Sequence, residues 1–483
     1  MTEAVGRPGG EPSRVLFVTG RLAEPALRRI LAAMAPEFAY DVAVMNITVA
    51  ALMTTSWIAR SLSVPAGTDL VLIPGLCEGD PAVLAEQSGV AVEKGPKDLR
   101  EIPAHFGRAA VARDYGAWDI EIVAEINNVP RLTADAVRGA AEYFRASGAD
   151  LIDIGCTPGV AFPALGDVVR DLVSAGMRVS VDSFDADEIR TAVAAGAELV
   201  LSVNSANLDV ARDLAGSAAR VVAVPELGGG LDTLDPILEK LAQWNVAYLV
   251  DPILEPIGFG FMASLERYAE ARRRYPDAPM LMGIGNLTEL TAADSTGVNA
   301  LLIAICQELG IRTVLTTEVI PWARGAVREV DVARRLMHYA VTRQTIPKGV
   351  DDRLVTVKDP SMLTFTEEEL RALHAEITDP NFRIFADRES ITVLNNERFV
   401  RTTDPTRLTE LFARLEVTEA THAFYLGREL AKASLAVTLG KTYRQEGALQ
   451  WGYLTPPDEA VGDHVKLTQR PIGNTRARLD RDR

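Results

Sequence analysis

Polar residues recur where short apolar segments end, in the stretch from Asp119 to Glu318. These residues are Asn127, Asn128, Asp153, Asp182, Asn204, Asp251, Asn286 and Glu318. Carboxylates accept hydrogen bonds and amides both accept and donate them, and carboxylates stabilise positive charge as it develops on a bound ligand. Each residue alone would suit a loop or a helix cap, because Asp and Asn favour those positions. Their repetition after successive segments favours a shared binding site.

Eight apolar segments that alternate with amphipathic ones would position these side chains. The apolar segments are Ile120–Ile126, Leu151–Ile154, Val179–Val181, Leu199–Val203, Val221–Val224, Ala247–Val250, Met280–Met282 and Thr313–Leu315. Each can form the centre of a strand buried on both faces, and each intervening segment is long enough for a helix. This rhythm predicts an α/β fold with a central (β/α)8 TIM barrel over residues 118–347, whose strands direct their carboxyl ends to one mouth.

Glycines are frequent in the loops expected at that mouth. They are Gly155, Gly159, Gly258, Gly260, Gly283 and Gly285. Glycine lets the backbone approach a ligand closely, although tight turns between strands and helices use it as well.

A Rossmann-like α/β domain is expected over residues 14–117, after a disordered N-terminus of residues 1–13. Arg14–Gly20, Asp41–Asn46 and Asp69–Gly75 read as strands, with helices over Glu24–Met34 and Ala50–Leu62. Strand–helix alternation predicts a small parallel sheet covered by helices. The domain contains neither of the common glycine-rich nucleotide motifs, so we predict no nucleotide site there. The polar segment Glu93–Asp98 reads as a connecting loop.

A C-terminal α+β domain with a polar tail is expected over residues 348–483. Arg353–Val357 and Phe382–Phe385 read as strands, and Ser390–Val400 as a hairpin with an Asn-rich turn. Thr366–Glu369 has the pattern of a capping box. Thr421–Leu439 carries apolar residues at helical spacing and is expected to form a long helix.

Composition excludes several classes of protein. The net charge of −16 argues against a nucleic acid partner. Three separated cysteines, without a CxxC pair, argue against a zinc site and a disulfide framework. We find neither an apolar run long enough to span a bilayer nor a signal-peptide pattern, and therefore expect a cytoplasmic protein without a membrane partner.

Four segments of the barrel resemble the pterin-binding family, which includes dihydropteroate synthases and corrinoid-dependent methyltetrahydrofolate methyltransferases. Gly148–Gly155, Val179–Ser183, Ser202–Asn204 and Asp251–Gly260 are similar, in order, to strand motifs of dihydropteroate synthase. Segments of the outer domains resemble the larger dihydropteroate synthase-related proteins associated with tetrahydromethanopterin biosynthesis. They are Phe17–Glu24, Asn46–Ala59, Ile73–Cys77, Val92–Asp98 and His422–Lys432.

The resemblance implies a transferase that condenses dihydro-hydroxymethylpterin pyrophosphate with an aryl amine, 4-(ribofuranosyl)aminobenzene phosphate. It implies catalytic roles for Asp182, Asp251 and Asn286. The substrate-binding residues would be Asn127, Asn128, Asp153, Asn204, Gly258, Gly260, Thr316, Thr317 and Glu318. It also allows Mg²⁺ at Asn127 and Asn128, and implies a homodimer.

Three loops depart from the synthase pattern because they lack its basic residues. They are Gly155–Pro158, Gly283–Asn286 and Leu315–Glu318. Two alternatives therefore stay open. Gly283–Asn286 and Glu125–Asn128 resemble motifs of the methyltransferases, which would make the protein a pterin-dependent methyltransferase that acts on a separate corrinoid protein. A non-catalytic pterin-binding or scaffold protein is the other alternative.

Overall fold

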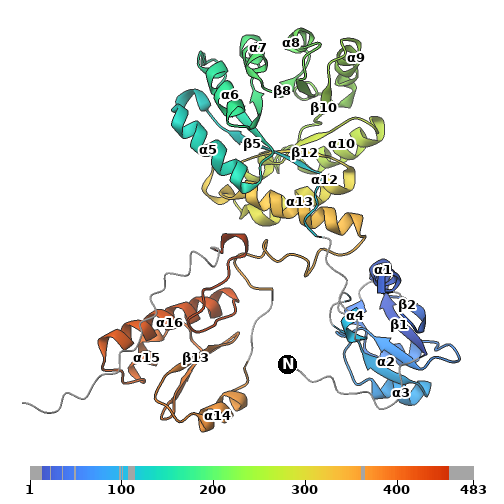
Figure 1. Ribbon diagram of the computed structural model, residues 1–483, viewed down its shortest axis with the longest axis vertical. Helices are drawn as coiled ribbons and strands as arrows, with labels where there is room; N and C mark the ends of the chain where they lie inside the picture. Colours follow the sequence, from blue (N-terminus) through green and yellow to red (C-terminus); the bar gives the residue numbers. More distant parts are fainter. Residues whose placement is uncertain are drawn as a thin grey trace, which may run out of the picture. The chain divides into compact units, whose positions relative to one another are not determined.

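The computed structural model describes residues 13–21, 23–34, 36–47, 50–96, 99, 102–106, 115–360 and 365–455. The polar tail from residue 456 onward and all but the last residue of the expected disordered N-terminus lie outside these ranges. The chain divides into two compact units, Met1–Leu354 and Val355–Arg483. The first unit contains a four-stranded sheet and an eight-stranded barrel (Figure 1).

Eight parallel strands form the barrel, and each of the eight predicted segments contributes one. They are β5 (Glu121–Ile126), β6 (Leu151–Gly155), β7 (Arg178–Asp182), β8 (Leu199–Val203), β9 (Arg220–Ala223), β10 (Tyr248–Val250), β11 (Leu281–Gly283) and β12 (Thr313–Thr317). The sheet order is β10-β9-β8-β7-β6-β5-β12-β11, and a parallel bridge between Val250 and Met280 joins its two ends. The predicted (β/α)8 barrel is therefore confirmed.

Helices surround the barrel strands (Figure 1). They are α5 (Ala134–Ser147), α6 (Leu165–Ser174), α7 (Ala186–Ala195), α8 (Leu208–Asp213), α9 (Asp235–Gln243), α10 (Phe261–Arg274), α11 (Gly285–Thr288), α12 (Ser295–Leu309) and α13 (Ala326–Thr342). No helix in the described ranges is long and apolar enough to cross a membrane.

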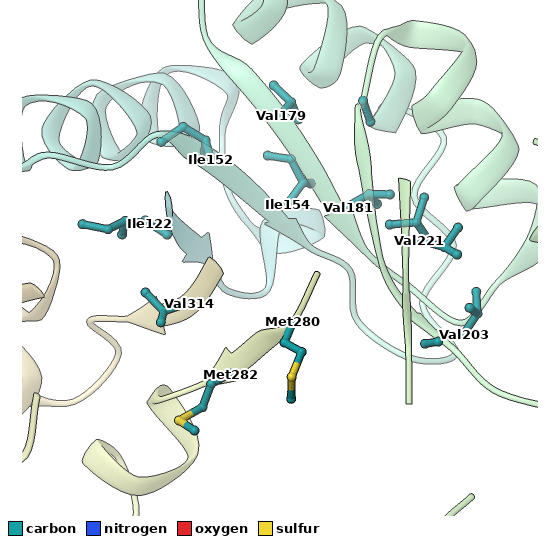
Figure 2. Packing of buried hydrophobic residues seen from close by; sticks show 14 of the residues in the cluster. Ile122, Ile152, Ile154, Val179, Val181, Val203, Val221, Met280, Met282 and Val314 are labelled. Carbon is teal, nitrogen blue, oxygen red and sulfur yellow. The ribbon is translucent and has the colours of Figure 1, made fainter. Parts of the chain in front are cut away.

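Strand alternation separates two apolar layers. The outward layer packs against the helices and includes Ile122, Ile152, Ile154, Val179, Val181 and Val314 (Figure 2). The inward layer contains Val123, Leu151, Leu199, Leu201, Val222, Leu249 and Leu281. Because side chains alternate along a strand, Glu125 shares the inward face with Val123, and Asp153 shares it with Leu151. The carboxylates at the strand ends thus lie above an apolar barrel interior.

Arg334 of α13 ties the outer helices to the amino-terminal end of the barrel. Its side chain is only 2 % exposed. It donates to the carbonyl oxygen of Ile120 at 2.7 Å, to Asp150 at 2.5 Å and to Asp331 at 2.8 Å, while its guanidinium lies over the ring of Trp118. This buried charge is therefore fully paired.

The N-terminal sheet is parallel and has the order β2-β1-β3-β4. Its elements are β1 (Arg14–Gly20), α1 (Glu24–Met34), β2 (Ala39–Met45), α2 (Thr55–Ser61), β3 (Leu70–Ile73), α3 (Ala82–Ser88), β4 (Ala91–Lys94) and α4 (Ile102–His105). The Rossmann-like arrangement is confirmed. The prediction of a loop at Glu93 and Lys94 was wrong, because both lie in β4. This strand lies at the sheet edge, where polar residues are tolerated.

The C-terminal unit has an antiparallel sheet of β13 (Arg383–Ala386), β14 (Ile391–Leu394) and β15 (Phe399–Thr402). Its helices are α14 (Glu367–Glu376), α15 (Leu408–Ala413) and α16 (Ala420–Leu439), and the capping box of Thr366 and Glu369 is confirmed. The strand predicted over Arg353–Val357 was wrong. Among the described residues this segment pairs with no strand, and the Thr356 carbonyl accepts a hydrogen bond from the Lys441 ammonium instead.

Candidate functional site

Three acidic side chains meet at the carboxyl ends of neighbouring strands. Glu125 of β5 lies beside Asp153 of β6 in the strand register, and Asp182 ends β7 beside Gly155. One oxygen of each carboxylate lies within 4.8 Å of the others. A Cβ atom at Gly155 would lie only 2.7 Å from Oε1 of Glu125. Any larger residue at this position would therefore collide with the Glu125 carboxylate. We call Glu125, Asp153 and Asp182 the carboxylate cluster.

Burial and mutual repulsion disfavour the charged forms of the carboxylate cluster. Burial, helped by the charges of Asp182 and Glu289, raises the pKa of Glu125 to about 7. Burial alone raises the pKa of Asp182 to about 6. Burial, followed by the charges of Asp182 and Glu125, raises the pKa of Asp153 well above its usual range. The cluster is therefore poised to hold protons or to bind a positive ligand.

Asn127 links this cluster to β12. Its Nδ2 donates to Oε1 of Glu125 at 2.8 Å, and its Oδ1 accepts from the Thr317 hydroxyl at 2.5 Å. Asn128 adopts a left-handed backbone, with φ of 55°, and its Oδ1 accepts from the Thr157 hydroxyl. Both amide oxygens expected to bind Mg²⁺ thus already accept hydrogen bonds. They fit that ion less well than the adjacent carboxylates do, because carboxylates are the preferred ligands of Mg²⁺.

Asp251 forms a second acidic position, directly after β10. Its Oδ1 accepts a hydrogen bond from the Tyr268 hydroxyl at 2.5 Å and another from the Ile253 amide at 2.8 Å. Burial raises the pKa of Asp251 to about 6, although these two hydrogen bonds oppose the shift. Asn286 is exposed in α11 and donates to the carbonyl oxygen of Leu254, in the loop that follows Asp251. The predicted catalytic residues Asp251 and Asn286 are therefore joined through one loop.

Other predicted binding residues lie in loops at the strand ends. Asn204 follows β8, and its Oδ1 accepts from the Ala206 amide at 3.0 Å. Gly258 and Gly260 have φ of 89° and 112° in the exposed loop before α10, so both need glycine for their backbone conformation. Within the described ranges, no hydrogen bond joins these three residues to the carboxylate cluster.

Two predicted binding residues face away from the cluster. Thr316 is fully buried and alternates with Thr317, so it shares the helix-facing side of β12 with Val314. Glu318 accepts hydrogen bonds from the Tyr143 hydroxyl of α5 and the Val327 amide of α13, both at 3.1 Å. Thr316 therefore faces the helices and not the barrel interior, whereas Glu318, directly after β12, is held by α5 and α13. Their substrate-binding roles stay predictions.

Sequence reasoning assigned no site role to Glu125 or Glu289. Glu125 precedes Asn127 by two residues, and the period of a strand could have placed both on one face. Burial raises the pKa of Glu289, which follows α11, and its charge contributes to the raised pKa of Glu125. No motif pointed to Glu289.

Comparisons with known proteins match separate parts of the chain. Residues 13–97 match a family of unknown function, DUF6513, and residues 366–446 match the family PterinBD-DUF4346. An uncharacterized protein of Methanocaldococcus jannaschii is 28% identical, and the alignment covers 90% of this chain and 99% of that protein. The expected relationship to pterin-binding proteins is confirmed by the second family match.

Solved dihydropteroate synthases are among the structures with some similarity to the chain. The Yersinia pestis enzyme, with a pterine–sulfa conjugate, is 18% identical with a TM-score of 0.37, covering 46% of this chain and 94% of its own. The Xanthomonas albilineans enzyme is 22% identical with a TM-score of 0.37, covering 46% and 93%.

Proposed function

We propose that the barrel mouth binds a pterin and that the protein condenses dihydro-hydroxymethylpterin pyrophosphate with an aryl amine. The observation that carries this proposal is the pair of largely buried carboxylates, Asp182 and Asp251, on motifs that resemble those of dihydropteroate synthase. The family match at residues 366–446 supports a pterin as the ligand.

The polar edge of a pterin suits these side chains. It presents an amino group and a ring N–H side by side, and a carboxylate can accept from both. Both hydrogen bonds to Asp251 end on its Oδ1, which leaves Oδ2 without a partner in the described part of the chain. Asn204 uses its Oδ1 locally, so its amide nitrogen stays available as a donor. Filling the site would supply the partners that these groups lack.

The reaction breaks the bond between the pterin methylene carbon and the pyrophosphate oxygen. The cation that remains is delocalised into the pterin, and the aryl amine attacks the methylene carbon. The amine loses a proton as the new C–N bond forms. Asp182 and Asp251, held against the ring, would stabilise the positive charge as it develops. We propose 4-(ribofuranosyl)aminobenzene phosphate as the amine and tetrahydromethanopterin biosynthesis as the pathway only from the sequence resemblance to the larger dihydropteroate synthase-related proteins.

Methyl transfer to a corrinoid protein is the second candidate. It is favoured by the exposed Asn286 amide, which the Leu254 carbonyl holds beside the Asp251 loop. It is also favoured by the three loops without basic residues, Gly155–Pro158, Gly283–Asn286 and Leu315–Glu318, because pyrophosphate departure benefits from positive charge. A non-catalytic pterin-binding role would fit the same loops. The homodimer and the cytoplasmic location stay predictions.

Release of pyrophosphate tests the synthase activity. Purified protein is incubated with dihydro-hydroxymethylpterin pyrophosphate and Mg²⁺, with the ribosylated amine, with p-aminobenzoate or without amine. We expect release that depends on the ribosylated amine and is abolished in Asp251→Ala. Release with p-aminobenzoate alone would indicate a folate-type synthase. Bound pterin without release would favour the methyltransferase or the binding protein.

A further inference from the structure

We propose that Glu125, Asp153 and Asp182 bind one hard divalent cation, such as Mg²⁺ or Mn²⁺, at the carboxyl ends of β5, β6 and β7. One oxygen from each residue lies within 4.8 Å of the others. Hard cations take oxygen ligands at roughly 2.0–2.6 Å. A single ion can therefore contact three oxygens at this separation after small side-chain adjustments. This site goes beyond the proposed function, because the cation would bind without a pterin.

Asp153 supplies the observation that points to a missing ligand. Its exposed fraction is 0 %, and neither carboxylate oxygen has a hydrogen-bond partner in the described ranges. Buried carboxylates are normally hydrogen-bonded or paired, because burial of an unpaired charge is unfavourable. Asp153 is therefore a buried carboxylate without the hydrogen-bond donor or positive charge that such a group normally has beside it.

Ser180 supplies a second unpartnered group at the same place. It lies beside Asp153 in the register of β6 and β7, is fully buried, and has a hydroxyl without a partner among the described residues. Ser180 is close enough to offset part of the rise in the pKa of Asp153, yet no hydrogen bond of ordinary geometry joins the two side chains. Both groups share the inward face of the barrel with Glu125 and Asp182.

Among the residues that the structure describes, no positive side chain pairs with this cluster. In the parts of the chain that the structure describes, no Lys, Arg or His forms an ion pair with these carboxylates, and no basic group contributes to their raised pKa values. The buried charge of Arg334 shows the opposite arrangement, since Asp150 and Asp331 both pair with it. A bound cation would complete the carboxylate cluster in the same way.

The ligand set selects the class of metal ion. All three ligands are carboxylates, which suit Mg²⁺, Mn²⁺ or Ca²⁺ more than ions that prefer nitrogen or sulfur. The Asn127 amide donates to Glu125 and so holds one of these ligands in place. Three carboxylates leave further coordination positions for water or for oxygen atoms of a substrate.

Binding of Mn²⁺ to the full-length, pterin-free protein tests this site. Equilibrium dialysis after treatment with a chelator should show one Mn²⁺ bound per chain. Asp153→Asn, which keeps the size of the side chain, should weaken binding by about tenfold or more. Asp209→Asn makes the same change at an exposed position of α8 and should leave binding unchanged. Equal binding by wild type and Asp153→Asn would overturn the proposal.

Thermal unfolding gives an independent readout and controls for folding. Without metal, Asp153→Asn and Glu125→Gln should unfold at or above the temperature of the wild type, because each removes a carboxylate from the cluster. Mn²⁺ should raise the unfolding temperature of the wild type only. Variants that are more stable, combined with a wild type that does not respond to Mn²⁺, would show that protons neutralise the cluster and would overturn the cation site. Pterin binding is tested at Asp251, so the two proposals can fail separately.

Discussion

The Tyr268 hydroxyl donates a hydrogen bond of 2.5 Å to Oδ1 of Asp251. Tyr268 is fully buried in α10, so this bond fixes the carboxylate that directly follows β10. Tyr268→Phe removes the donor and keeps the ring. Because this hydrogen bond lowers the pKa of Asp251, the variant should have a higher Asp251 pKa.

The pH dependence of pterin binding measures that shift. If the ionised carboxylate holds the pterin, wild-type affinity should fall as the pH decreases through about 6. The midpoint should move upward in Tyr268→Phe, and unfolding should require about 1–3 kcal/mol less free energy. An unchanged midpoint with normal affinity would argue against Asp251 as the pterin ligand.

Asp251 should also make stability depend on pH. Its pKa is about 6 in the folded protein and 3.8 for the isolated group, so the folded state binds the proton more tightly. Its contribution to stability is therefore fully present below about pH 4 and is lost as the pH rises through about 6. The difference amounts to about 1–3 kcal/mol. Asp251→Asn should remove this part of the pH dependence.

Urea unfolding of the wild type and Asp251→Asn at several pH values checks this contribution. The wild type should lose stability relative to the variant between pH 4 and 7. Parallel curves would show that the carboxylate titrates at an ordinary pH.

Gly155→Ala should disturb the carboxylate cluster. The added methyl group would lie 2.7 Å from Oε1 of Glu125 and 3.0 Å from the Ile126 carbonyl oxygen. We expect a loss of about 1–3 kcal/mol in stability and a displaced Glu125 side chain. Gly139→Ala is the matched control, because nothing lies within 4 Å of the new atom in α5. It should stabilise the protein by up to about 1 kcal/mol. Equal effects in denaturant unfolding would contradict the crowding at Gly155.

Arg334→Ala should strongly destabilise the barrel. The change leaves Asp150 and Asp331 without their buried partner and removes the hydrogen bond to the Ile120 carbonyl. Loss of one partner of a buried ion pair costs about 3–5 kcal/mol. Arg138→Ala removes an exposed ion pair with Asp171 and should cost less than about 1 kcal/mol. Calorimetry compares the two, and similar unfolding temperatures would contradict the structural role of Arg334.

The barrel could be predicted because strands buried on both faces need continuous apolar segments. The strands β1, β2 and β3 of the N-terminal sheet could be predicted for the same reason. The strand β4 was missed because its position at the sheet edge permits the polar residues Glu93 and Lys94. The strand expected over Arg353–Val357 failed because strand-like composition does not supply a pairing partner.

The site could be predicted only in part. Asp182 ends β7 and Asp153 lies two residues before the end of β6, and strand ends in a barrel converge. Glu125 was missed as a site residue because it lies within an apolar segment, and only the register of β5 with β6 brings it beside Asp153. The predicted position of Thr316 depended on which face of β12 turns inward, and the sequence does not specify that face. The hydrogen bonds that Glu318 accepts from Tyr143 of α5 and Val327 of α13 could not be predicted from the sequence either.

Calorimetric titration with dihydro-hydroxymethylpterin tests the central claim, that the barrel mouth binds a pterin, most directly. We predict one binding site per chain in the wild type. Affinity should fall by about tenfold or more in Asp251→Asn, since one charge-assisted contact contributes about 1.5–3 kcal/mol. It should stay unchanged in Asp209→Asn. Absence of binding, or equal affinity in Asp251→Asn and the wild type, would contradict the pterin site.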